Sequence, residues 1–287
     1  MEYAVLNNGV KMPLEGFGVF QVPDLKICKE AVLNAIKAGY RLIDTAAAYM
    51  NEEAVGDAIH EAIESGIVKR EELFITTKLW VQDMNYESAK KAFETSLKKL
   101  RLDYIDLYLE HQCFSDYYGA WRAMEELYKE GKIKAIGVSN FYPDRLVDFC
   151  LNVDVVPAVN QVELHPFFHQ NDAIKIMKEY GVQPQAWGPF AEGRNNIFNH
   201  PILSEIGKKY NKSAAQVALR WNVDRGVSVL PKSTHKERIE SNFDIWDFKL
   251  DEEDMKKIAS LDIGHSEIID HFNPETPKML NNFKIHD

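Results

Sequence analysis

Short apolar segments alternate with amphipathic segments along most of the chain. Eight of the apolar segments predict buried strands, because they are short and are bounded by glycine or charged residues. These are residues 15–20, 42–43, 73–75, 105–109, 133–138, 158–159, 182–187 and 227–230. In the segments between them, apolar residues recur with the spacing of one helix face. The predicted helices are residues 27–38, 52–64, 87–100, 117–130, 172–180 and 213–223.

The repeated strand–helix order predicts βαβ units and a parallel sheet of the α/β class. Eight strands in a chain of 287 residues favour a closed (β/α)8 TIM barrel. Residues 3–6 and 10–12 flank Asn8-Gly9 and predict an N-terminal β-hairpin with a tight primed turn. Residues 270–287 have no clear periodicity, and we expect a C-terminal loop over the barrel mouth. No linker interrupts the chain, so we expect residues 1–287 to form a single domain.

A doubly wound dinucleotide-binding fold is the main alternative architecture. Its fingerprint is weak here, because residues 16–21 read GFGVFQ, which begins as G-x-G but ends in glutamine and leads into no helix. Gly131-Lys132 lacks the earlier glycine of a P-loop. A nucleotide would therefore be bound without a glycine-rich phosphate turn.

The charge balance and the cysteines restrict the class of protein. The chain has 34 Lys and Arg against 44 Asp and Glu, a net charge of −10, which argues against binding to a nucleic-acid backbone. Its apolar runs are shorter than the ~18 residues of a membrane span, and its first residues resemble no secretory signal. Cys28, Cys113 and Cys150 are scattered, which suits a reducing cytosol and suggests no metal site. We expect a cytoplasmic protein.

Polar residues follow three neighbouring predicted strands at the ends where a barrel places its active site. Asp44 and Tyr49 follow the second strand, Lys78 follows the third and His111 follows the fourth. We predict that Lys78 lowers the pKa of Tyr49 by favouring the phenolate, while Asp44 keeps Lys78 charged and oriented. His111 can hydrogen-bond a carbonyl oxygen, which suits a reaction that adds hydride to carbon and a proton to oxygen.

The order of several segments resembles the aldo-keto reductase family over essentially the whole chain. The matching segments are GFG at 16–18, DTAAAY at 44–49, TKLW at 77–80, LYLEH at 107–111, IGVSNF at 136–141, VNQVELHP at 159–166 and LPKS at 230–233. The family's fold is a (β/α)8 barrel, and its catalytic tetrad falls on Asp44, Tyr49, Lys78 and His111. The chain looks most like the prokaryotic branch of diketogluconate and methylglyoxal reductases, which implies small polar dicarbonyl substrates.

This resemblance implies reduction of small aldehydes and ketones with NADPH, with NADP+ as the product and Tyr49 as the proton donor. It also assigns residues to each part of the cofactor. The assigned residues are Ser139, Asn140 and Gln161 for the carboxamide, Trp187 for stacking on the nicotinamide, Gly188 near the pyrophosphate, Lys232, Ser233 and Arg238 for the 2′-phosphate, and Asn242 for the adenine. Arg and Lys are suitable partners for a phosphate dianion. No metal is implied.

Aromatic residues near the predicted mouth are candidates for the substrate cavity. We expect Phe20, Trp80, Phe114 and Trp121 to form it together with His111, and the alternative is ordinary core packing. Most of these residues lie in or near loops, whose shape a sequence pattern does not define.

The chain departs from the family's pattern at several positions. Members often continue the catalytic histidine as His-Trp-Pro, but this chain has His111-Gln112-Cys113, which removes one bulky wall of the pocket. Glu110 stands where an apolar residue is usual, and strand alternation predicts that it points away from the barrel interior. Gly188 replaces a serine, so backbone amides are expected to replace a hydroxyl contact with the pyrophosphate.

Other interpretations stay open at this stage. Ser139-Asn140 could instead cap a helix that begins near Pro143. The barrel could hold NADPH as a sensor or regulatory subunit with incidental turnover. It could also be a Schiff-base lyase that uses Lys78 as the amine. We expect a monomer or a weak homo-oligomer whose partner is a small-molecule carbonyl substrate, with no nucleic acid or membrane involved.

Overall fold

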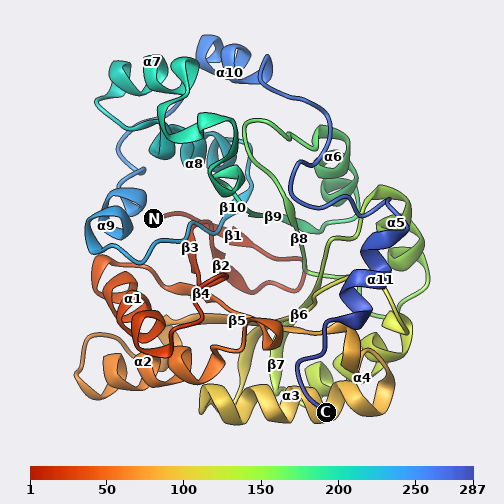
Figure 1. Cartoon of the computed structure of the whole chain (residues 1–287). Helices are drawn as coiled ribbons and strands as arrows, with labels where there is room; N and C mark the ends of the chain where they lie inside the picture. Colours follow the sequence, from red (N-terminus) through yellow and green to blue (C-terminus); the bar gives the residue numbers. More distant parts are fainter.

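Eight parallel strands form the centre of the computed structural model, which describes residues 1–287 (Figure 1). The strands are β3 (Gly16–Gly18), β4 (Leu42–Asp44), β5 (Phe74–Leu79), β6 (Ile105–Glu110), β7 (Ile133–Ser139), β8 (Val159–Glu163), β9 (Gln183–Trp187) and β10 (Ser228–Val229). They lie side by side in chain order, and every neighbouring pair is parallel. Glu15, directly before β3, bridges Val229 of β10 and closes the sheet. The predicted (β/α)8 barrel is therefore confirmed, and the doubly wound alternative is wrong.

Helices surround the strands (Figure 1). They are α1 (Leu25–Ala38), α2 (Glu52–Glu64), α3 (Tyr86–Leu100), α4 (Tyr117–Lys129), α5 (Pro143–Leu151), α6 (Asn171–Glu179), α7 (Pro201–Tyr210), α8 (Ala214–Asp224), α9 (Lys236–Phe243), α10 (Glu252–Ala259) and α11 (Glu275–Asn282). The six predicted helices are all present. Helices α5, α7, α9, α10 and α11 are not among the predicted ranges, because segments of 8 to 10 residues contain too few apolar positions for a clear period. None of the helices has the length and apolar character needed to cross a membrane.

Helix α1 shows why these segments fold as they do. Asp24 caps its first turn by accepting a hydrogen bond from the backbone N–H of Ile27. Gly39 ends the helix with a left-handed φ of 116°. A Cβ atom at Gly39 would also lie 2.6 Å from the ring of Phe243 in α9, so a larger residue would both strain the backbone and clash.

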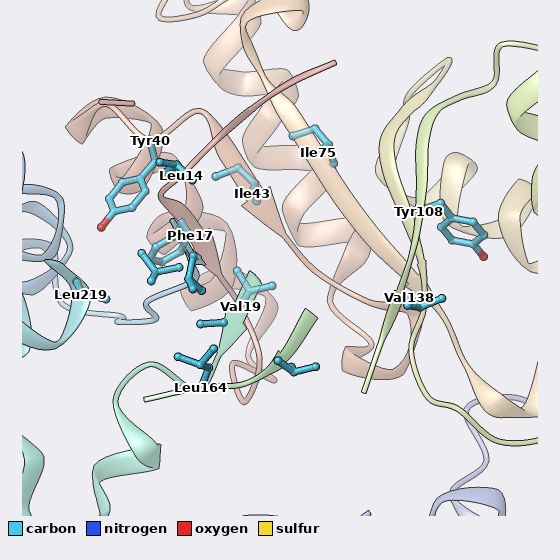
Figure 2. Close-up of a cluster of buried hydrophobic side chains, with 14 of the residues drawn as sticks. Leu14, Phe17, Val19, Tyr40, Ile43, Ile75, Tyr108, Val138, Leu164 and Leu219 are labelled. Carbon is cyan, nitrogen blue, oxygen red and sulfur yellow. The ribbon is translucent and has the colours of Figure 1, made fainter. Parts of the chain in front are cut away.

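Successive residues of a strand pack on opposite sides of the barrel wall. Phe17, Ile43, Ile75, Tyr108 and Val138 belong to the large core that the strands share with the helices (Figure 2). A second cluster fills the barrel interior with Leu42, Phe74, Leu107, Leu109, Ala135, Val159 and Leu230, together with Leu6 and Met12 of the N-terminal hairpin. Because side chains alternate with a period of two, polar residues on the same face of the strands, nearer to the strands' C-terminal ends, point into the barrel interior close to its mouth.

The N-terminal hairpin of β1 (Tyr3–Val5) and β2 (Lys11–Pro13) is present as predicted. The side chains of Asn7 and Asn8 donate hydrogen bonds to carbonyls at the N-terminal ends of β8 and β7, so the hairpin covers the end of the barrel opposite the mouth. The predicted primed turn is wrong. A primed turn centred on Asn8-Gly9 requires a positive φ at its first central residue, Asn8, and only Gly9 has a positive φ, at 86°. The loop therefore has three residues and ends in a left-handed glycine.

The C-terminal tail crosses the barrel mouth, as expected, but it is not a plain loop. It contains α11, and Ile269, Leu280 and Phe283 from this tail line the cavity described below. The indole N–H of Trp80 donates to the carbonyl of Phe283 at 2.8 Å, and Gln82 donates to the carbonyl of His286 at 2.8 Å. These contacts join segments far apart in sequence, which explains why no local pattern predicted them.

Candidate active site

A cavity of about 850 Å³ opens at the C-terminal ends of the strands. Its volume is in the usual range for small-molecule sites of roughly 300–1,000 Å³. Its lining includes Phe20, Asp44, Tyr49, Trp80, His111, Gln112, Ser139, Asn140, Gln161, Trp187, Gly188, Lys232, Ser233 and Arg238, together with residues of the tail. The structure thus brings most of the predicted site residues to one place.

Lys78 lies beneath this cavity and is completely buried. Its ammonium Nζ lies 2.6 Å from Asp44 Oδ1, 2.9 Å from the carbonyl oxygen of Thr45 and 3.1 Å from Tyr49 Oη. The three acceptors match the three N–H donors of an ammonium group. Asp44 Oδ2 accepts a further hydrogen bond from Gln161 at 2.9 Å, which holds the carboxylate in place.

Burial and charge act in opposite directions on these groups. Burial would lower the pKa of Lys78, but Asp44 and Tyr49 raise it above its usual value, so Lys78 stays charged. Burial raises the pKa of Tyr49 above its usual value, and the nearby Lys78 offsets only part of that rise. The prediction that Lys78 lowers the pKa of Tyr49 overall is therefore wrong. Tyr49 holds its proton at neutral pH and can donate it.

His111 lies between Tyr49 and Trp80, with its ring centre 5.5 Å from the first ring and 5.2 Å from the second. Burial and the neighbouring Lys78 hold the pKa of His111 well below its usual value, so the imidazole is neutral. Its Nδ1 atom is buried without a hydrogen-bond partner. Nε2 is therefore the nitrogen available to a ligand, and a neutral ring can donate one hydrogen bond there.

Amide and hydroxyl groups from β7, β8 and β9 form a second polar group beside the tetrad. Gln161 donates both of its amide hydrogens, to Asp44 and to Gln185 at 2.8 Å. Asn140 donates to the backbone carbonyl of His111 at 3.0 Å and accepts from the indole N–H of Trp187 at 2.8 Å. Asn140 also donates to Ser139 Oγ at 3.1 Å, so the amide hydrogens of both residues already have protein partners, and their oxygens are left to accept from a ligand.

The alternative role of Ser139-Asn140 as a helix cap is wrong. Tyr142 occupies the N-cap position of α5 and makes no side-chain capping bond. Ser139 instead donates to the carbonyl of Gln161 at 2.7 Å, and Asn140 has a left-handed φ of 63°. Both residues are therefore held toward β8 and the cavity.

A cationic region lies at the other end of the cavity. Lys232 and Arg238 line it, are exposed, and form no ion pair with any carboxylate. Ser233 lies beside them and accepts a hydrogen bond from the N–H of His235 at 3.1 Å. Gly188 also lines the cavity, with a left-handed φ of 60°. Asn242 is buried in α9 and does not line the cavity.

The structure separates the aromatic residues that were predicted to bind substrate. Phe20 and Trp80 line the cavity, and the ring of Phe20 lies 5.0 Å from that of Tyr49. Phe114 lines a smaller cavity of about 260 Å³ next to the main one, with its ring stacked on His271. Trp121 is a core residue that packs against Phe149 of α5.

Some residues of the site have no counterpart among the sequence predictions. Gln185 joins Gln161 to Ser228 inside the barrel, through bonds of 2.8 and 3.2 Å. Gln185 could have been found from the sequence, because it is a polar residue at an inward-facing position of the predicted strand 182–187. Ile269 and Leu280 of the tail gave no such signal, because their segment has no period.

Glu110 is a buried carboxyl group outside the tetrad. Strand alternation places it with Tyr108 on the helix side of β6, as predicted, and neither of its oxygens has a hydrogen-bond partner. Burial raises the pKa of Glu110 well above its usual value, so it is protonated in the fold. An unpartnered buried polar group costs about 1–3 kcal/mol.

Glu110→Met is therefore expected to increase the free energy of unfolding by about 1–3 kcal/mol. The gain should be larger at pH 8 than at pH 5. The folded protein keeps a proton that the unfolded chain releases, so the wild type loses stability as pH rises from about 4.3 toward the raised pKa. Urea unfolding at both pH values measures this. Glu163→Met is the control, because Glu163 is equally buried but bonded to His165 and Ser266, and it should be destabilising.

Comparison with known proteins agrees with this geometry. The sequence model of the Aldo/keto reductase family matches residues 24–263. The glyoxal reductase of Bacillus subtilis (strain 168) is 49% identical over 257 residues, which cover 89% of this chain and 91% of that protein. The methylglyoxal reductase DkgA of Escherichia coli (strain K12) is 44% identical over 262 residues, covering 90% and 93%.

Solved structures show the same relationship. The aldo-keto reductase AKR2E4 of Bombyx mori, in complex with NADP, superposes with a TM-score of 0.89 and 36% identity. The alignment covers 94% of this chain and 95% of that one.

Proposed function

The chain belongs to the aldo/keto reductase family, and from this we infer that it reduces small aldehydes and ketones to alcohols with NADPH. The observation that carries the proposal is the chain of contacts from Asp44 through the buried Lys78 to the hydroxyl of Tyr49. In this arrangement the charged Lys78 supports the protonated hydroxyl of Tyr49, which faces a cavity large enough for a cofactor and a small substrate.

Each residue of the tetrad has a distinct role in this proposal. NADPH, when bound, supplies hydride to the carbonyl carbon. Tyr49 donates its proton to the carbonyl oxygen, which completes the alcohol. Lys78 stabilises the phenolate that Tyr49 becomes, and Asp44 keeps Lys78 in position. The neutral His111 donates a hydrogen bond to the carbonyl oxygen and so orients it.

The residues present suit the cofactor. Both amide hydrogens of Gln161 are donated to protein groups, and its oxygen is left to accept a hydrogen bond. A carboxamide has N–H groups that can donate to such an oxygen. Trp187 presents an aromatic side chain to the cavity beside Asn140. Lys232 and Arg238 are cations without carboxylate partners, which suits a phosphate dianion.

Arg238→Met is expected to raise KM for NADPH by about 10- to 100-fold, because a hydrogen bond to a charged group contributes about 1.5–3 kcal/mol. KM for NADH, which lacks the 2′-phosphate, should change little. Initial rates with both cofactors at one saturating carbonyl concentration measure the difference. The control is Lys236→Met, since Lys236 lies in the same helix but pairs with Glu240 and does not line the cavity. An equal change for NADH and NADPH would exclude Arg238 from phosphate binding.

The two other functions are not favoured. A Schiff-base lyase needs an accessible amine, whereas Lys78 is completely buried and its three N–H donors are occupied. A sensor that only binds NADPH would not need a tyrosine proton donor, and so would not need the hydrogen bond by which Lys78 supports the hydroxyl of Tyr49. Repeated turnover of NADPH with a carbonyl compound distinguishes the enzyme from the sensor.

The proposed substrates are small polar carbonyl compounds. Two relatives are named for the reduction of glyoxal and methylglyoxal, and we extend that dicarbonyl class to this chain as a proposal. NADPH oxidation followed with a panel of aldehydes, ketones and dicarbonyls, repeated with NADH, tests it. No turnover with any member would contradict the function. A cytoplasmic location and a monomeric or weakly oligomeric state stay predictions.

A further inference from the structure

A polar contact between Gln112 and the C-terminal tail is not used by the mechanism above. Gln112 follows His111 at the end of β6, is 7% exposed, and lines the cavity. His271, which precedes α11, places its Nε2 atom 2.9 Å from the Gln112 side-chain oxygen. The contact joins the loop after β6 to the tail at the wall of the cavity. Gln112 occupies the position at which members of the family often have a tryptophan.

The hydrogen-bond pattern determines which end of the Gln112 amide is free. An amide oxygen only accepts, so with the oxygen of Gln112 facing His271 the ring donates from Nε2, in the tautomer that carries its proton there. Burial lowers the pKa of His271 to about 4, so the ring is neutral and has a single N–H, which this contact uses. In this tautomer the buried Nδ1 atom of His271 carries no proton, and no side chain bonds to it.

The amide NH2 group of Gln112 consequently makes no hydrogen bond within the protein, yet it is not among the buried unpartnered atoms. It is open to the cavity, one residue from the group that binds the reacting carbonyl oxygen. With the proton of His271 on Nε2, this orientation of the amide is the favoured one, because a reversed amide would direct N–H toward N–H. In this arrangement the cavity has a pair of hydrogen-bond donors beside its reaction centre, held by the contact with His271.

The residue before Gln112 and the residue bonded to it, His111 and His271, are both neutral. Trp80 and Leu280 pack together, and Trp80 contacts the neutral ring of His111. Arg145 lies behind the wall, where it donates to the carbonyl of Cys113 and lines the smaller cavity instead. Neutral donors suit a neutral oxygen, whereas a carboxylate bound to the Gln112 amide would lose hydration without forming an ion pair with Gln112 or His271.

We propose that Gln112 is a specificity-determining residue whose amide N–H groups bind a second, neutral oxygen of the substrate, on the carbon next to the reacting carbonyl, and that His271 is its positioning residue. The proposal rests on the carbonyl reductase function above. A substrate that lacks the second oxygen leaves the donors unpaired when it displaces water, and that loss is what produces selectivity.

The test compares two substrates that differ only in this oxygen, 2-oxopropanal and propanal. The ratio of their kcat/KM values is measured for the wild type and for Gln112→Leu, which removes both polar groups. The ratio in favour of 2-oxopropanal should fall about tenfold in Gln112→Leu, as expected for the loss of one hydrogen bond. Glyoxylate, which has a carboxylate at that position, should be a poorer substrate of the wild type than 2-oxopropanal.

Variants of His271 separate positioning from folding. His271→Phe should lower the same ratio, and His271→Gln, whose amide can donate where Nε2 did, should restore most of it. The control is Gln183→Leu, because Gln183 lies at the opposite end of the barrel and bonds to the carbonyl of Gly226. It should leave the ratio unchanged.

The outcomes separate the two proposals. If the wild type reduces both substrates but Gln112→Leu leaves the ratio as it was, or if Gln183→Leu lowers it equally, the specificity role of Gln112 is wrong and the reductase function stands. If the wild type reduces neither substrate nor any other carbonyl, the reductase function fails, and this inference fails with it.

Discussion

Tyr49→Phe is expected to lower kcat/KM about a thousandfold for every carbonyl substrate, in line with the usual contribution of a positioned general acid. The hydroxyl of Tyr49 is the only protonated group that Lys78 touches, and burial keeps its proton in place at neutral pH. Phenylalanine keeps the ring that packs against Phe20 and His111 but cannot donate a proton. Carbonyl-dependent oxidation of NADPH, followed by absorbance, measures the loss.

Cofactor binding is the control for this variant. Tyr49→Phe should bind NADPH with the wild-type dissociation constant, measured by quenching of protein fluorescence, because the predicted cofactor contacts lie on other strands. Normal binding with lost turnover places Tyr49 in the chemical step. Full turnover in Tyr49→Phe would remove the tyrosine from its proposed role and would require another proton donor.

Lys78→Met is expected to abolish turnover and to lower the free energy of unfolding by about 3–5 kcal/mol, because removing one member of a buried ion pair leaves the other uncompensated. Asp44 is the group left behind, since Lys78 lies 2.6 Å from it and both are buried. Burial then raises the pKa of Asp44 without an opposing cation. The folded variant holds a proton that the unfolded chain releases, so its deficit should grow as pH rises above about 4. Urea unfolding at pH 5 and pH 8 measures both effects.

The double variant Asp44→Asn/Lys78→Met separates stability from catalysis. Without a buried charge it should recover most of the lost free energy of unfolding, yet turnover should stay absent because no cation supports the phenolate of Tyr49. Two results would contradict the assignment. One is a double variant as unstable as Lys78→Met, and the other is a single variant that is fully stable and retains normal turnover.

Much of the site could be predicted from the sequence because barrel strands present their C-terminal ends at one mouth. Asp44, Lys78 and His111 each follow a strand that a local apolar pattern indicates, so their convergence needed only the fold class. The assignment of the cofactor residues came from the resemblance of ordered segments to a known family, and their individual roles stay predictions that the variants above test.

The errors have physical causes that a local pattern does not contain. The net direction of the pKa of Tyr49 depends on how much water burial removes, and proximity to Lys78 alone suggested the opposite sign. Phe114 follows the same strand as His111 but turns into the smaller cavity. The hairpin turn required one more residue than Asn8-Gly9, because only Gly9 adopts a left-handed conformation.

The chain's own residue pattern determined the alternation of strands and helices, the barrel, and the polar groups at the strand ends, since each depends on spacing within a few residues. Contacts between distant segments were decided only in the tertiary structure. The carbonyl of Phe283 holds Trp80, His271 orients Gln112, and Gln161 holds Asp44 from across the barrel. Such contacts depend on where whole segments pack in three dimensions, and burial sets their energies, so neither the spacing nor the composition of the chain specifies them.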